Sequence, residues 1–200
     1  MRVQITLTPS EAKRVIAKAV ALLPEVVEAR EKGLVLLKGG TTVSAVAEEL
    51  FGVPLRLSGR VSGRGTLAAA EANPEEPHCI LVRGGAIENA DEDFASAAGK
   101  LGRGDVIVIG ANAIDGEGNA AMMAGSVGGN RPGLGWAALT SEGAAVIIAA
   151  GLEKLIPGTI RDAMMAAGRK GVDKSIGMAV GLLPLTGRLV TEKEALEILA

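Results

Sequence analysis

Aromatic residues are almost absent from this 200-residue sequence, which contains only Phe51, Phe94 and Trp136. Proteins that bind single-stranded nucleic acid rely on several aromatic side chains for base stacking, so this composition argues against such a partner. The net charge of -2 at pH 7 also provides no overall field that would attract nucleic acid or an anionic membrane. We therefore expect no nucleic-acid partner and no membrane partner.

Cysteine and histidine are equally scarce, with Cys79 and His78 the only examples. A lone cysteine forbids an intramolecular disulfide and fits a reducing compartment. A zinc site built on these two residues would need two carboxylate ligands, and a Ser-His-Asp triad would depend on His78, where the chain enters an apolar strand. The sequence thus predicts no metal, no other cofactor and a strand-edge role for His78.

Long apolar runs are missing as well. The most apolar window, residues 143–152, is far shorter than the ~20 residues that a transmembrane helix needs. Residues 1–4 lead into mixed polar sequence without the apolar segment of a secretory signal, so we expect a cytoplasmic protein. A composition of 48% hydrophobic and 22% charged residues suits a single packed domain over residues 1–200.

Apolar runs alternate with helical patterns along the chain. Four mainly apolar runs are typical of strands that are covered on both faces: residues 34–37, 79–82, 105–109 and 144–150. Between and around them, helical spacing recurs in segments such as residues 43–50 and 91–100. This alternation predicts an α/β fold of three layers, with a mostly parallel sheet and helices on both faces.

Local signals mark several boundaries. Residues 3–7 alternate between apolar and polar side chains, as a half-buried strand does. A capping box at Thr8–Glu11 opens a helix, which Pro24 kinks or restarts before Gly33 ends it. A second capping box at Thr191–Glu194 predicts a short terminal helix.

Two glycine-rich regions do not fit the alternation. Residues 57–65 carry a doubled Ser-Gly-Arg, and residues 116–135 hold many of the 28 glycines. We predict a long loop in both places, because glycine weakens helices and strands. Residues 168–189 are apolar but interrupted by glycine, and their pattern predicts no particular element.

Three glycine loops follow predicted strands, at residues 38–42, 83–85 and 110–119. Ligands of open parallel sheets bind beyond the carboxyl ends of the strands, where helix N-termini offer free N–H groups. We therefore expect the three loops to meet at one edge and to bind a small anionic metabolite. The predicted ligand-binding residues are Lys38, Gly39, Gly40, Thr41, Thr42, Arg83, Gly84, Gly85, Asn112, Asn119, Arg131 and Lys154.

The first of these loops, residues 38–42, has the composition of a phosphate site. Glycine lets backbone donors approach an anion, two threonine hydroxyls add donors, and Lys38 adds charge. The alternative is a tight strand-to-helix turn in which Thr41 or Thr42 caps the helix.

Asp115 and Glu117 are the predicted catalytic residues. A carboxylate beside backbone donors and a basic group can be tuned for proton transfer, and either side chain can also bind sugar hydroxyls. The alternative is that this Asp-Gly sequence forms an ordinary solvated turn.

An NADP-binding oxidoreductase is an alternative function. Residues 63–68 match the looser dinucleotide fingerprint, and Arg83 follows about 20 residues later, where an acidic ribose ligand otherwise occurs. Residues 133–138 give a second match. The chain has no Gly-Lys-Ser/Thr at the spacing of a nucleotide-binding P-loop, so it does not predict an ATPase.

Three segments carry a resemblance to a known superfamily. Residues 38–43 resemble the glycine/threonine phosphate loop of ribose-5-phosphate isomerases, and residues 108–119 resemble their second loop. Residues 151–157 are similar to a stretch in lactate-utilisation proteins. The superfamily also contains glucosamine-6-phosphate deaminases, CoA transferases and isomerases related to translation initiation factor 2B.

The resemblance spans residues 34–157 and implies a three-layer α/β fold that binds an anionic, phosphosugar-like metabolite. The implied chemistry is isomerisation or group transfer. In the isomerases a catalytic aspartate stands where this chain has Asn112, whereas Asp115 is retained. A noncatalytic metabolite sensor or structural protein of the same fold is therefore the alternative, and a homo-oligomer is a further expectation.

Overall fold

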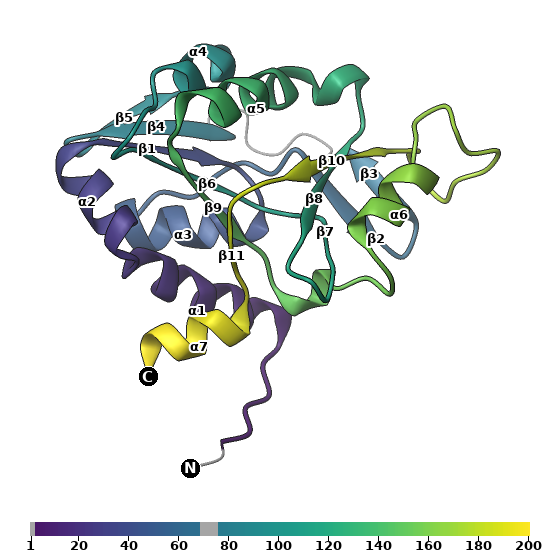
Figure 1. Cartoon of the computed structure of the whole chain (residues 1–200), viewed down its shortest axis with the longest axis horizontal. Coiled ribbons are helices and arrows are strands. Elements are labelled where there is room, and N and C mark those ends of the chain that lie inside the picture. Colours follow the sequence, from purple (N-terminus) through teal and green to yellow (C-terminus); the bar gives the residue numbers. More distant parts are fainter. Residues whose placement is uncertain (1–2, 69–75) are drawn as a thin grey trace.

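The protein is represented by a computed structural model that describes residues 3–68 and 76–200 (Figure 1). Its centre is a six-stranded sheet in the order β11-β9-β6-β1-β4-β5. These strands are β1 (Leu34–Lys38), β4 (Cys79–Arg83), β5 (Ala86–Asn89), β6 (Val106–Ile109), β9 (Ala145–Ala149) and β11 (Arg188–Val190). β1, β6, β9 and β11 are mutually parallel, whereas β4 runs antiparallel to β1 and to β5. The predicted mostly parallel sheet is confirmed.

Helices cover both faces of this sheet and complete the three layers (Figure 1). Six helices contribute: α1 (Pro9–Ala21), α2 (Pro24–Lys32), α3 (Thr41–Phe51), α4 (Phe94–Gly99), α5 (Asn130–Glu142) and α7 (Glu192–Leu199). Val35 and Leu37 pack with α1, α2, α3 and α7, while Leu34 and Leu36 pack with α4 and α5. Because successive side chains of a strand point to opposite faces, one apolar run fills both cores.

The capping signals in the sequence mark real helix ends. Thr8 and Glu11 form the predicted capping box at the start of α1, and Thr191 and Glu194 form the second box at α7. Pro24 occupies the first turn of α2, so it restarts the helix, and Gly33 ends it. These motifs are short-range, which is why the sequence predicts them correctly.

Both regions predicted as long loops contain regular structure, so those predictions are wrong. Residues 57–65 include most of a hairpin, and residues 116–135 include a strand and the start of α5. The further elements are β2 (Gly59–Ser62), β3 (Gly65–Ala68), β7 (Ala113–Ile114), β8 (Ala120–Ala124), η1 (Val127–Gly129), η2 (Leu152–Lys154), α6 (Ile160–Ala166) and β10 (Gly181–Leu185). Glycine here marks turns between short strands rather than unstructured chain.

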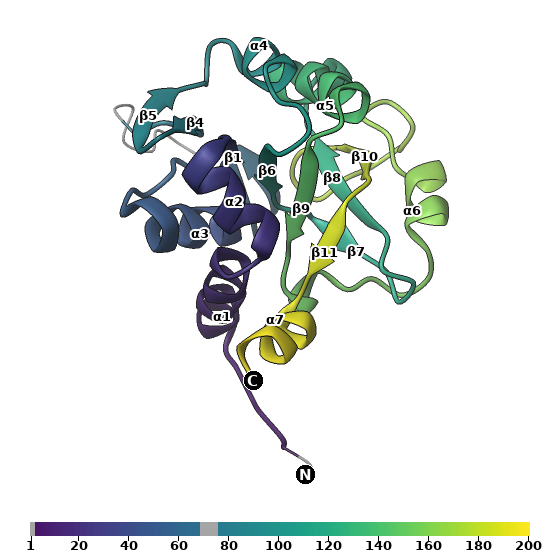
Figure 2. The same ribbon diagram turned by 60° about the vertical axis from the view of Figure 1, so that its left-hand side comes forward.

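β7, β8 and β10 form a second, antiparallel sheet in the order β10-β8-β7. Figure 2 shows this sheet beside β9 and β11, with α6 on its outer side. Met122 and Leu185 from this sheet pack against Ile109 and Ile148 of the central sheet. The unassigned region 168–189 thus supplies β10 to the small sheet and the start of β11 to the central one.

The predicted strand at residues 3–7 is absent, because the segment is irregular and pairs with no described strand. Val3 and Ile5 are 68% and 50% exposed, so the alternation has no sheet face to pack against. The predicted helix at residues 91–100 is shorter, since α4 begins only at Phe94. Within the described ranges, no helix has the length and apolar character that crossing a membrane requires.

Candidate functional site

The carboxyl ends of β1, β6 and β9 define one edge of the central sheet. Residues 38–42 follow β1 at this edge, and residues 110–112 follow β6 beside them. α3 begins here, directly after the first of these loops. Residues 38–42 and the first three residues of the predicted loop 110–119 therefore lie at the edge where open parallel sheets bind ligands, whereas residues 115–119 form the turn between β7 and β8 of the second sheet.

The third loop, formed by Arg83, Gly84 and Gly85, lies at the opposite edge, so the prediction that all three loops meet is wrong. β4 is antiparallel to β1, and Arg83 pairs with Leu34 at the amino end of β1. Gly84 and Gly85 form the hairpin turn to β5, with φ values of 53° and 86°. These three exposed residues do not belong to the candidate site.

Residues 38–42, hereafter the Lys38 turn, leave the start of α3 open. Gly40 is the N-cap and provides no side-chain hydrogen bond, so the alternative that Thr41 or Thr42 caps the helix is wrong. The first helical bond joins the Ser44 N–H to the Gly40 carbonyl at 2.7 Å. The N–H groups of the first turn therefore keep their capacity to donate to a ligand.

The two glycines of the turn differ in their surroundings. A Cβ on Gly39 would lie 2.4 Å from the carbonyl oxygen of His78 and 2.5 Å from its Nδ1, so this position requires glycine. A Cβ on Gly40 would meet nothing within 4 Å. Gly39 serves close packing, whereas Gly40 faces the open space in front of α3.

A hydrogen-bonded cluster of Arg56, His78 and Asp91 holds the Lys38 turn in place. The Gly39 N–H donates to the His78 carbonyl at 2.6 Å, and the His78 ring interacts through Nδ1 with the Arg56 carbonyl at 2.7 Å. A carbonyl oxygen only accepts, so Nδ1 carries the proton. Burial first, and then the nearby Lys38 ammonium, lower the pKa of His78, so the ring is neutral at pH 7.

Asp91 anchors the same cluster. Its carboxylate accepts the backbone N–H groups of His78 and Cys79 at 2.8 and 2.6 Å, and it pairs with Arg56 at 2.7 Å. Burial alone would raise the pKa of Asp91, but these donors outweigh burial and lower it. The sequence analysis missed this support, because Arg56, His78 and Asp91 are separated along the chain and no local motif joins them.

Lys38 is the charged residue of the turn and is 91% buried, with 9% of its surface exposed. Within the part of the chain that the structure describes, its ammonium group has neither a hydrogen bond nor an ion pair. No fully buried side-chain nitrogen of the described residues lacks a partner, so this ammonium retains access to solvent. Burial lowers the pKa of Lys38. Burial also raises the pKa of the neighbouring Cys79 to about 11, so this residue is a neutral thiol at pH 7 and supplies no counter-charge.

Residues 115–119, hereafter the Asp115 turn, have a closed arrangement. Asp115 is 4% exposed, and its carboxylate accepts N–H groups from Glu117 at 3.0 Å, Asn119 at 2.9 Å and Ile160 at 2.9 Å. These donors, that of Ile160 foremost, lower the pKa of Asp115 to about 2. A carboxylate held in this way ties the turn to α6 and is a poor base at neutral pH.

The other predicted site residues have varied surroundings. Glu117 is exposed on its turn, and Asn119 donates its side-chain amide to Asp115 at 3.0 Å. The Asn112 side chain accepts the Met123 N–H at 2.9 Å, which joins β8 to the end of β6. Lys154 is half-buried in η2. The side chain of Arg131 lies outside the described residues.

The two dinucleotide-like matches do not occupy the structural context of that motif. Residues 63–68 span the turn and second strand of the β2–β3 hairpin, and residues 133–138 lie inside α5. The fingerprint requires a tight turn between a parallel strand and the helix that follows it. Neither segment provides this turn, so neither supports NADP binding.

The Lys38 turn has two features that suit an anion, an uncapped helix N-terminus at Gly40 and, two residues earlier, a lysine without a described partner. Among the described residues, no three His, Cys, Asp or Glu side chains gather as a metal site requires. Comparison with known proteins finds no matching family model, no matching curated protein and no matching solved structure.

Proposed function

We propose that this protein binds a small anionic metabolite through a phosphate group at the Lys38 turn. The observation that carries the proposal is the largely buried Lys38 side chain, which has no partner in the described part of the chain and precedes the uncapped start of α3 by two residues. The phosphate would accept the N–H groups of the first helical turn and the hydroxyls of Thr41 and Thr42.

Electrostatics support an anion at this place. A buried cation without a counter-charge is costly, and a bound phosphate would supply the missing charge. The dipole of an 11-residue helix adds a positive potential at the same point. Anion binding would raise the lowered pKa of Lys38, so the complex takes up a proton when Lys38 is neutral in the free protein.

A phosphosugar-like metabolite fits this chemistry, since the hydroxyl groups of its sugar can bind polar residues at the same edge of the sheet, such as Asn112 after β6. The saturated carboxylate of Asp115 weighs against proton transfer by that residue. We therefore favour ligand binding as the primary function, with isomerisation or group transfer as the catalytic alternative. Turnover distinguishes ligand binding from catalysis. Exchange of the carbon-bound protons of the bound sugar in deuterated water would identify an isomerase.

The test is calorimetric titration with ribose 5-phosphate, glucosamine 6-phosphate and inorganic phosphate, with ribose as the uncharged comparator. Gly40→Val should abolish phosphate binding without unfolding, because its Cβ enters open space and its φ of -179° suits any residue. Gly99→Val is the matched control, since Gly99 is also open and lies in α4. Equal binding by both variants contradicts the proposal.

The predicted proton uptake gives a second readout. Above pH 8, where phosphate monoesters are already dianions, affinity should fall as the pH rises through the pKa of Lys38 in the free protein. Titrations in buffers with different ionisation enthalpies measure the protons taken up. Lys38→Met should remove both the uptake and at least about tenfold of the affinity, because a charge-assisted contact contributes roughly 1.5–3 kcal/mol.

A further inference from the structure

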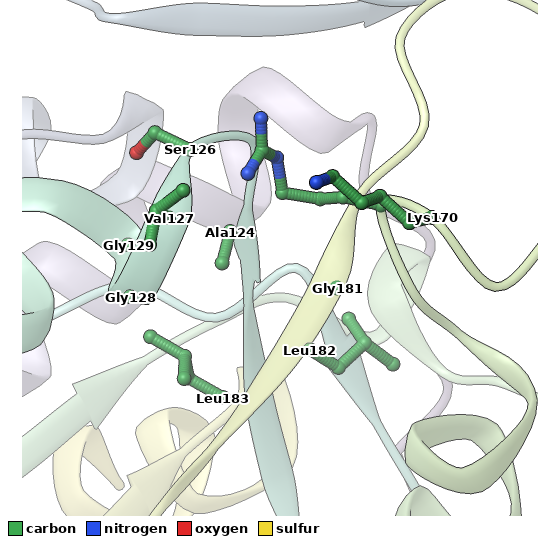
Figure 3. A pocket seen from close by; sticks show the side chains of 10 residues that line it. Ala124, Ser126, Val127, Gly128, Gly129, Lys170, Gly181, Leu182 and Leu183 are labelled. Carbon is green, nitrogen blue, oxygen red and sulfur yellow. The ribbon is translucent and has the colours of Figure 1, made fainter.

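A separate pocket of about 370 Å³ opens between β8, the turn before α5, β10 and the segment after α6 (Figure 3). We call it the β10 pocket and define it by Ala124, Val127, Arg169, Lys170, Leu182 and Leu183. Its volume lies within the range of roughly 300–1,000 Å³ that is usual for small-molecule sites. None of these residues belongs to the Lys38 turn or to the Asp115 turn.

The rim of the β10 pocket is positively charged. Arg169 and Lys170 are exposed and line it, and Figure 3 shows Lys170 extending across β10 towards the side where Ser126 lies. Neither cation has an ion pair within the described ranges. The described lining contains no carboxylate, so no residue of the pocket neutralises these charges.

The walls of the pocket are apolar. Ala124 comes from β8, Leu182 and Leu183 from β10, and Val127 from the turn before α5 (Figure 3). Val127 is 82% exposed, so its side chain is accessible to a ligand. A cationic rim above an apolar wall matches a ligand that has one anionic end and one apolar end.

Two glycines shape the turn before α5. Gly128 and Gly129 have φ values of 61° and 73°, a left-handed conformation that brings the chain round tightly into α5. A Cβ on Gly129 would lie 2.8 Å from Leu183, so the turn packs directly on the pocket wall. The Gly129 N–H donates to the Ser126 carbonyl at 3.1 Å, which fixes the turn ahead of α5.

From this pocket, its two unpaired cations and its apolar wall, we propose a second binding site for a small organic anion with a short alkyl body. Arg169 and Lys170 bind the carboxylate or phosphate, and Val127 and Leu183 cover the alkyl part. An uncharged apolar ligand would leave both cations without a role, and a cationic ligand would be repelled. The site is independent of the proposed phosphosugar site.

The probe is hexyl phosphate, titrated by calorimetry into Gly40→Val protein so that binding at the Lys38 turn does not contribute. Hexyl phosphate should bind, whereas hexylammonium should not, and inorganic phosphate should bind more weakly because it lacks the alkyl contact. Adding Arg169→Gln and Lys170→Gln should weaken hexyl phosphate binding by about tenfold or more. Adding Val127→Ser should weaken it less and leave inorganic phosphate unchanged.

Lys174→Gln is the matched control, because Lys174 is an exposed cation of the same segment that does not line the pocket. All these positions are exposed, so the variants should keep the fold, which circular dichroism verifies. The proposal is overturned if hexyl phosphate does not bind, if the double substitution leaves its affinity unchanged, or if Lys174→Gln weakens it equally. Because Arg169, Lys170 and Lys174 lie outside the Lys38 turn, a loss of affinity confined to the first two is assigned to the β10 pocket whether or not Gly40→Val blocks that turn.

Discussion

The Lys38 turn and the Asp115 turn look alike in sequence, since both combine glycine with charged and polar residues after a buried strand. In the structure they differ in what their charges contact. Lys38 is buried without a partner in the described chain, whereas Asp115 accepts N–H groups from three backbone positions. The Lys38 turn can therefore still bind a ligand, whereas the hydrogen-bond acceptors of Asp115 are already used within the fold.

The largest expected effect is a loss of stability at the Asp115 turn. Asp115→Ala would leave the buried N–H of Ile160 and those of the turn without their acceptor, and should lower the free energy of unfolding by about 3 kcal/mol. Urea denaturation measures this change. Asp115→Asn, which keeps one carbonyl acceptor, should cost less. A loss below about 1 kcal/mol for the alanine variant would show that the turn does not depend on Asp115.

The same carboxylate predicts a pH dependence. The pKa of Asp115 is about 2 in the folded protein and lies near the ordinary value of about 3.9 in the unfolded chain. Its contribution to stability is therefore complete above about pH 4 and is lost as the pH falls towards 2. Asp115→Asn should flatten this part of the stability profile, and an unchanged profile would contradict the assignment.

The second largest expected effect is a difference in stability between variants of the two glycines in the Lys38 turn. Gly39→Ala should destabilise the protein by about 2 kcal/mol, because its Cβ would lie 2.4 Å from the His78 carbonyl oxygen. Gly40→Ala adds a Cβ in open space and should change stability by less than about 0.5 kcal/mol. Thermal unfolding of both variants measures the difference. Equal destabilisation would mean that Gly40 is not open.

Short-range signals explain how much of this fold could be predicted from the sequence. The apolar run of β1 and the capping boxes of α1 and α7 are local, and the structure confirms them. The direction of β4 depends on pairing with β1, which no local pattern encodes. A signal did exist, because Gly84-Gly85 between two short apolar runs is typical of a two-residue hairpin, and a hairpin reverses the chain.

In the candidate site, too, local features could be predicted from the sequence and long-range contacts could not. Residues 38–42 show their glycines and threonines in sequence, but the burial of Lys38 and its lack of a partner arise only in the folded chain. Asp115 binds the N–H of Ile160, 45 residues further along, and this contact changes it from a predicted acid/base group into a structural one. The β10 pocket joins segments that are distant in sequence, so no motif indicates it.

The next prediction tests how much the unpaired Lys38 side chain destabilises the protein. Lys38→Met should raise the free energy of unfolding by about 1 kcal/mol, because a buried cation without a partner is replaced by an apolar side chain of similar length. The pKa of Lys38 is lower in the folded than in the unfolded chain, so the advantage should grow as the pH falls from the ordinary lysine pKa towards the lowered one, and should stay constant below it. Lys100→Met, at an exposed lysine, is the control for urea denaturation.

The smallest effect belongs to Glu117. Its side chain is exposed, and its one described side-chain contact is a long hydrogen bond of 3.4 Å from Asn119. Glu117→Gln keeps the backbone N–H that donates to Asp115, so stability should change by less than about 0.5 kcal/mol. Phosphate affinity at the Lys38 turn should also remain the same. A clear loss of phosphosugar affinity, with inorganic phosphate unaffected, would instead show that Glu117 reaches the sugar, and would make the Asp115 turn part of the binding site.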